Sequence, residues 1–89
     1  MRRAILQKKC DVGLVQMIAR GKDREKFLDM VRILCVEERV PNTLRPHKLH
    51  GEYEGLWECH IESDWLLIYK VTPSELLLAR TGTHADLFE

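Results

Sequence analysis

All four histidines of this 89-residue chain lie in its C-terminal half. They are His47, His50, His60 and His84. The ordinary pKa of imidazole lies near neutral pH, so a histidine can both accept and donate a proton under physiological conditions. A base and an acid on opposite sides of a cleft are what in-line phosphoryl or acyl transfer needs. The histidines therefore indicate acid–base chemistry.

Two carboxylates accompany them. Glu58 and His60 are two residues apart in a strand-like stretch, so they share one face, while Trp57 and Cys59 share the other. Asp64 follows His60 by four residues across an expected hairpin turn, where its carboxylate would approach and orient the imidazole of His60. The alternative is that Asp64 only caps the turn.

Other chemistries have weaker support. His47-x-x-His50 together with His60 offers three imidazoles to a zinc ion, but this spacing matches no zinc motif. No serine stands in a nucleophile-elbow context. Three separated cysteines without a C-x-x-C pair support neither a disulfide framework nor a cysteine–zinc site. We therefore expect no metal and no cofactor, and we interpret His50 as a bystander.

The charge is divided unequally along the chain. Residues 1–48 hold twelve Lys and Arg against six Asp and Glu, a net charge of +6, whereas residues 49–89 hold two against eight, a net charge of −6. A basic half can contact phosphate, but a chain that is neutral as a whole binds nucleic acid poorly by itself. If the substrate is a polyanion, another component must help to present it.

The length of the chain supports one hydrophobic core, so we expect a single domain over residues 1–89. No run of about 18 apolar residues is present, and the N-terminus becomes charged too early for a signal peptide. We therefore expect a soluble, cytoplasmic protein with no membrane contact.

Hydrophobic periodicity predicts two helices ahead of the histidines. Apolar residues at helical spacing indicate a helix over 11–20, with Asp11 as its N-cap, and a second over 23–38, with Asp23 as its N-cap. Together they predict a helical hairpin.

Alternating and continuous apolar runs predict the strands. The expected strands cover residues 2–6, 53–61, 65–71 and 75–81. His47 then lies in the loop before an antiparallel meander and His84 in the loop after it, and we expect Trp57 and Trp65 in the core. The predicted fold class is α+β, with an N-terminal strand and a helical hairpin packed on a small antiparallel sheet in the order β-α-α-β-β-β.

Three motifs resemble the YafQ branch of the RelE toxin superfamily. They are H-K-L-H-G at 47–51, W-E-C-H-I-E-S-D-W-L-L-I-Y-K at 57–70 and R-T-G-T-H-A-D-L-F at 80–88. The N-terminal half matches only in length and helix pattern. The resemblance implies a compact RelE-like fold and the toxin of a type II toxin–antitoxin pair, an endoribonuclease that cuts messenger RNA in the ribosomal A site. A ribosome would supply the positioning that a neutral protein lacks.

The resemblance also implies partners. A cognate antitoxin of the DinJ or RelB kind would bind the toxin, and the complex would reach operator DNA through the antitoxin. Two rival functions share the fold: a ParE-type gyrase poison, in which an acid–base histidine set has no evident purpose, and an inactive toxin-fold binding module, against which a full set of active-site residues argues.

Five residues fall on active-site positions of the family. His47 matches the histidine of H-x-L-x-G, His60 and Asp64 match H-x-x-x-D-W, and His84 and Phe88 match the ending R-T-G-T-H-x-x-L-F. The implied reaction is attack of a ribose 2′-OH on the adjacent phosphate, without metal. We expect His84 to be the acid and His47 or His60 the base, with Asp64 orienting His60 and Phe88 packing on a base or on the site wall.

Three further residues are expected to contact the substrate. They are Arg80, Lys48 and Glu58, the last of which keeps a carboxylate where a relative has aspartate.

Overall fold

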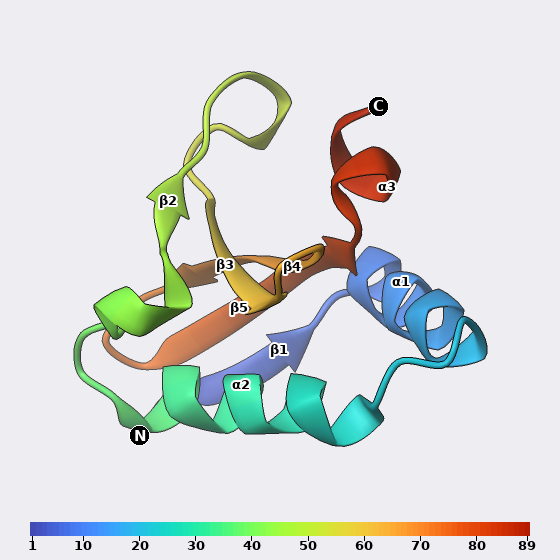
Figure 1. Cartoon of the computed structure of the whole chain (residues 1–89). Helices are drawn as coiled ribbons and strands as arrows, with labels where there is room; N and C mark the ends of the chain where they lie inside the picture. Colours follow the sequence, from blue (N-terminus) through green and yellow to red (C-terminus); the bar gives the residue numbers. More distant parts are fainter.

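A mixed five-stranded sheet forms the centre of the molecule, in the strand order β1-β5-β4-β3-β2 (Figure 1). The computed structural model describes all 89 residues. The strands are β1 (Arg3–Leu6), β2 (His47–Lys48), β3 (Trp57–Glu62), β4 (Trp65–Val71) and β5 (Glu75–Gly82). The α+β class and the antiparallel meander β3-β4-β5 are confirmed. β1, however, pairs in parallel with β5, and the long connection that a parallel pair needs contains both helices and the strands β2 to β4.

Both predicted helices form. α1 (Lys8–Ala19) begins three residues earlier than expected, with Gln7 as its N-cap, so Asp11 is not the cap but lies in the first turn, where a negative charge suits the helix dipole. α2 (Arg24–Val36) begins as predicted, because the Asp23 carboxylate accepts a hydrogen bond from a backbone N–H of its first turn. No helix of the structure is both long enough and apolar enough to cross a bilayer.

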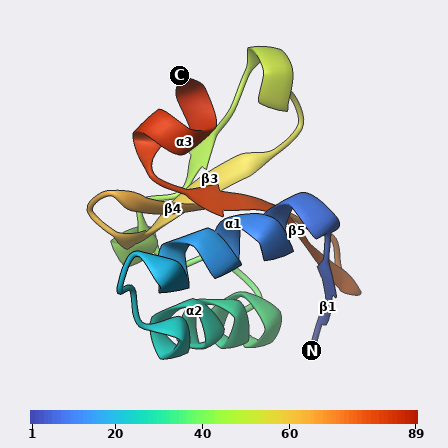
Figure 2. The same cartoon turned by 90° about the vertical axis from the view of Figure 1, so that its right-hand side faces the viewer.

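The two helices cover one face of the sheet (Figure 2). Where α1 crosses β5, the backbones touch: a methyl group at Gly13 would lie 2.2 Å from the carbonyl oxygen of Thr81. The main core lies between these layers. It consists of Cys10, Leu14, Met17, Phe27, Met30, Leu34, Cys59, Trp65, Leu67, Tyr69, Leu76 and Leu78.

The opposite face of the sheet carries a smaller cluster beneath a short C-terminal helix, α3 (His84–Phe88). Its buried members are Tyr53, Leu66, Ile68, Ala79 and Leu87. The sequence predicted a loop where α3 forms, and a strand over residues 53–56, which are instead a 3₁₀ turn and its exit. Trp65 is buried as predicted, whereas Trp57 is 38% exposed and the prediction of a core position is wrong.

Candidate active site

Three elements on one side of the sheet carry the histidines of interest. β2 and α3 both project from the same side, with β3 between them (Figure 1). His47 lies on β2 opposite Glu58 of β3, His60 lies on β3 opposite Leu66 of β4, and His84 is the first residue of α3. Residues 37 positions apart in the sequence are thereby brought together.

The side chains form a continuous row of rings. The ring centroids of His47 and His60 are 6.2 Å apart, those of His60 and His84 are 6.1 Å apart, and those of His84 and Phe88 are 6.4 Å apart. The structure therefore brings together four of the five predicted active-site residues directly. The fifth, Asp64, joins the row through His84.

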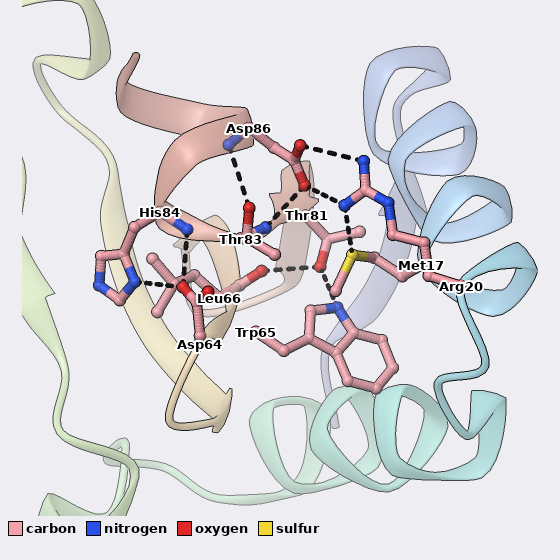
Figure 3. A network of polar contacts seen from close by, with 9 residues as sticks. All are labelled: Met17, Arg20, Asp64, Trp65, Leu66, Thr81, Thr83, His84 and Asp86. Atoms are coloured by element: carbon pink, nitrogen blue, oxygen red, sulfur yellow. Dashed lines mark hydrogen bonds and ion pairs between the residues drawn. The ribbon is translucent and has the colours of Figure 1, made fainter.

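Asp64 contacts His84 rather than His60, so the predicted pairing is wrong. One carboxylate oxygen, Oδ1, accepts the backbone N–H of His84 at 2.9 Å and lies 2.5 Å from its Nδ1 (Figure 3). The strand register shifts between His60 and Glu62, and beyond this irregularity the turn directs Asp64 toward α3. Both hydrogen bonds from His84 lower the pKa of the Asp64 carboxyl. Because a carboxylate only accepts hydrogen bonds, Nδ1 of His84 carries the hydrogen and Nε2 remains for proton exchange.

His60 has the properties of a proton acceptor. Its Nδ1 is buried and has no hydrogen-bond partner. Burial, and next the positive charge of Arg45, lower the pKa of His60, which favours the neutral imidazole. Sequence reasoning missed Arg45. It precedes Pro46 in a loop and adopts a left-handed backbone conformation (φ 51°), and this conformation has no signature in the sequence.

Glu58 faces the histidine row and is mostly buried. Its Oε1 lies 3.9 Å from Nδ1 of His47. One ligand atom each from His47, Glu58 and His60 lie within 4.8 Å of one another, and two imidazoles with a carboxylate are donors that zinc and copper accept. His50 is not part of this group, because its Nδ1 pairs with Glu54 at 3.4 Å.

The remaining two predicted contacts lie off the row. Lys48 is opposite Trp57 in the β2–β3 register, so it projects to the other side of the strand from His47. Arg80 donates to the Tyr53 hydroxyl at 3.0 Å and lines a separate hollow with residues of α1. It therefore reaches the row only through Tyr53, whose ring meets Phe88 edge-on at 5.7 Å.

Tyr53 is a second residue that the sequence analysis missed. Its hydroxyl donates to the carbonyl oxygen of Leu87 at 3.0 Å and accepts from Arg80, so it connects β5 to the end of α3. Burial raises its pKa, which keeps the hydroxyl protonated and able to donate. The sequence predicted a strand over residues 53–61, and a strand position for Tyr53 did not indicate this role.

Comparisons with known proteins agree on one family. A sequence profile described as "Bacterial toxin of type II toxin-antitoxin system, YafQ" matches residues 5–89. The chain is 38% identical over 78 residues to the mRNA interferase toxin YafQ of Escherichia coli K12, covering 88% of this chain and 84% of the relative. Its fold matches a chain of the E. coli DinJ–YafQ complex (TM-score 0.87, 31% identity, 100% of both chains). It also matches a metal-bound toxin from Helicobacter pylori (TM-score 0.85, 30% identity, 99% and 100% coverage).

Proposed function

Since this chain belongs to the YafQ family of type II toxin–antitoxin toxins, which includes mRNA interferases, we propose that it cleaves messenger RNA in the ribosomal A site by metal-independent acid–base catalysis. The observation that carries the proposal is the row of His47, His60 and His84, with Asp64 bound to the last of them. Acid–base catalysis needs two titratable groups on either side of the reacting phosphate, and the row offers three.

The proposed step forms one bond and breaks another at the same phosphorus. The base, His47 or His60, removes the proton of the ribose 2′-OH as this oxygen attacks the phosphate. The bond from phosphorus to the 5′ oxygen then breaks, and His84 gives its proton to the leaving oxygen. The products are a 2′,3′-cyclic phosphate and a 5′-OH. Arg45 brings a positive charge to His60, where it would stabilise the negative charge that develops on the phosphorane.

The role of the ribosome follows from the charge of the protein. Fourteen basic and fourteen acidic residues give no net charge, so the chain has little general attraction for RNA. The histidine row lies at the surface and shares no deep cavity with Lys48 or Arg80. A ribosome that holds the messenger in place would supply the orientation that these features lack.

We also propose a cognate antitoxin of the DinJ kind as the partner. The E. coli relative forms a complex with DinJ, and this chain matches the toxin of that complex over its whole length. Operator DNA would be bound by the antitoxin in such a complex.

The decisive experiment compares His84→Ala with His50→Ala during expression in bacteria, with cleavage ends mapped by primer extension. We expect His84→Ala to slow cleavage by about 10²- to 10⁴-fold, the usual contribution of one acid or base, and still to bind the antitoxin. His50→Ala should cut like the wild type, because His50 lies outside the row.

Purified components test the reaction itself. Programmed ribosomes should yield fragments with 2′,3′-cyclic phosphate ends in frame with the codons. Undiminished toxicity of His84→Ala would remove His84 from the mechanism. Equally fast cleavage of the naked messenger would refute the dependence on the ribosome.

A further inference from the structure

The two ends of the short helix α3 carry His84 and Phe88, but five residues cannot hold a helix by themselves. Its position must come from contacts with the rest of the molecule. One contact, from Asp64 to the backbone and ring of His84, lies within the proposed active site. Another buries Leu87 in the smaller cluster. Tyr53 holds the far end of the helix through the Leu87 carbonyl. A further contact involves Asp86, which is not part of the proposed chemistry.

Asp86 connects the start of α3 to the end of α1. Its Oδ2 accepts the backbone N–H of Thr83 at 2.9 Å, and its own N–H donates to the Thr83 hydroxyl, which completes a capping box. The two terminal nitrogens of the Arg20 guanidinium donate to the same carboxylate, Nη1 to Oδ2 at 2.6 Å and Nη2 to Oδ1 at 3.1 Å (Figure 3). The hydrogen bond from Arg20 is the main reason that the pKa of Asp86 lies far below the usual carboxyl range.

We propose that Arg20 is a positioning residue for His84, acting through Asp86 and the capping box at Thr83. This inference rests on the proposed function, because His84 is its acid. Arg20 lies at the C-cap of α1, whose inner face is anchored in the main core by Met17. Its two hydrogen bonds therefore fix the Asp86 carboxylate relative to the core. The carboxylate in turn fixes the backbone of Thr83, which leads into His84.

The local geometry leaves Asp86 little freedom. A methyl group at Gly82 would lie 2.9 Å from Cβ of Asp86, so the side chain is packed directly against the end of β5. Arg20 is also confined on its other side, where Nη1 lies 3.5 Å from the sulfur of Met17. Arginine suits this place because its planar fork binds both carboxylate oxygens, which a lysine cannot do.

The alternative role of Arg20, as a basic residue of the proposed nuclease, is to bind RNA directly. The two roles predict different behaviour of Asp86→Asn. If Arg20 held RNA, the loss of its acidic partner would free the guanidinium, and cleavage would be maintained or improved. If Arg20 positions His84, Asp86→Asn must impair cleavage much as Arg20→Met does.

The kinetic test uses Arg20→Met, Asp86→Asn and the double variant with programmed ribosomes. We expect each single variant to lower kcat by about 10- to 100-fold with KM nearly unchanged, because a catalytic group displaced by about 1 Å can cost about 10²-fold. The double variant should be no slower than the slower single variant, since both changes break one connection. Arg20→Lys should restore part of the rate.

The matched control is Arg3→Met. It removes another arginine–carboxylate pair, Arg3–Glu75 at 2.9 Å, which joins β1 to β5 away from α3, and it should cut like the wild type. A rise in KM alone, an unimpaired Asp86→Asn, or multiplicative effects in the double variant would each overturn the proposal.

A measurement without RNA separates this proposal from the proposed function. Backbone ¹⁵N order parameters of residues 84–88 should match the rigid core in the wild type and in Arg3→Met, and they should fall selectively in Arg20→Met and Asp86→Asn while circular dichroism stays native. Unchanged order parameters in both variants would overturn the positioning role even if cleavage were slow. If the wild type cut no RNA at all, the proposed function would fail, and these spectra would still decide whether Arg20 orders α3.

Discussion

Gly13→Ala has two effects of opposite sign on the free energy of unfolding. Alanine is favoured over glycine inside a helix by about 1 kcal/mol, so helix propensity alone predicts stabilisation. The added methyl group, however, would lie 2.2 Å from the carbonyl oxygen and 3.3 Å from the carbonyl carbon of Thr81. Relief requires α1 and β5 to separate by about 1 Å, and overpacking of this kind costs about 1–3 kcal/mol. The backbone of β5 yields little, because Thr81 is paired with Leu67 of β4.

Subtracting the gain of about 1 kcal/mol from this cost leaves a net loss of up to about 2 kcal/mol, which lowers Tm by up to about 16 °C in a protein of this size. Thermal unfolding followed by circular dichroism measures it, and Gln16→Ala, on the exposed side of α1, is the control that gains helix propensity without a contact. The same separation would carry Arg20 away from Asp86, so cleavage should slow as well. A Tm above that of the wild type would refute the close approach of α1 and β5.

Two further predictions concern protons and metals. Folding lowers the pKa of Asp86, so the stabilisation from its ionised form is complete above the unfolded carboxyl pKa and is lost as the pH falls below about 4. In that acid range, the urea midpoint of unfolding should drop less in Asp86→Asn than in the wild type. Equal drops in the two proteins would contradict this. Added Zn²⁺ should slow cleavage by occupying His47, Glu58 and His60. Toxin that has been treated with EDTA, and from which the EDTA has been removed, should keep its full cleavage rate. A cleavage rate that is lost on EDTA treatment and restored by zinc would contradict metal-independent catalysis.

The sequence predicted an element well wherever local pattern alone determines it. β4 has the predicted bounds, because a continuous apolar run must be buried on both faces and therefore lies between two layers. α3 was missed because it depends on contacts between residues distant in sequence, such as Arg20 with Asp86. A trace of it was nevertheless present, since Thr83-x-x-Asp86 has the spacing of a capping box.

The candidate site was predicted in part for a similar reason. The motifs named three histidines that the structure brings together in one row, and strand alternation placed Glu58 and His60 on one face. The partner of Asp64 depended on a register shift at the end of β3, which residue types do not encode in any readable way. Arg45 acts through a backbone conformation that the sequence does not reveal.

The parallel pairing of β1 with β5 has a consequence for the synthesis of the protein. β1 is the first strand to be translated, and its only neighbour in the sheet is the last. A nascent chain therefore cannot close the sheet, dock α3 or align His84 with His60 until β5 and α3 have left the exit tunnel. On the proposed function, the ribosome that makes this domain does not meet an aligned histidine row while these two segments are still inside its tunnel.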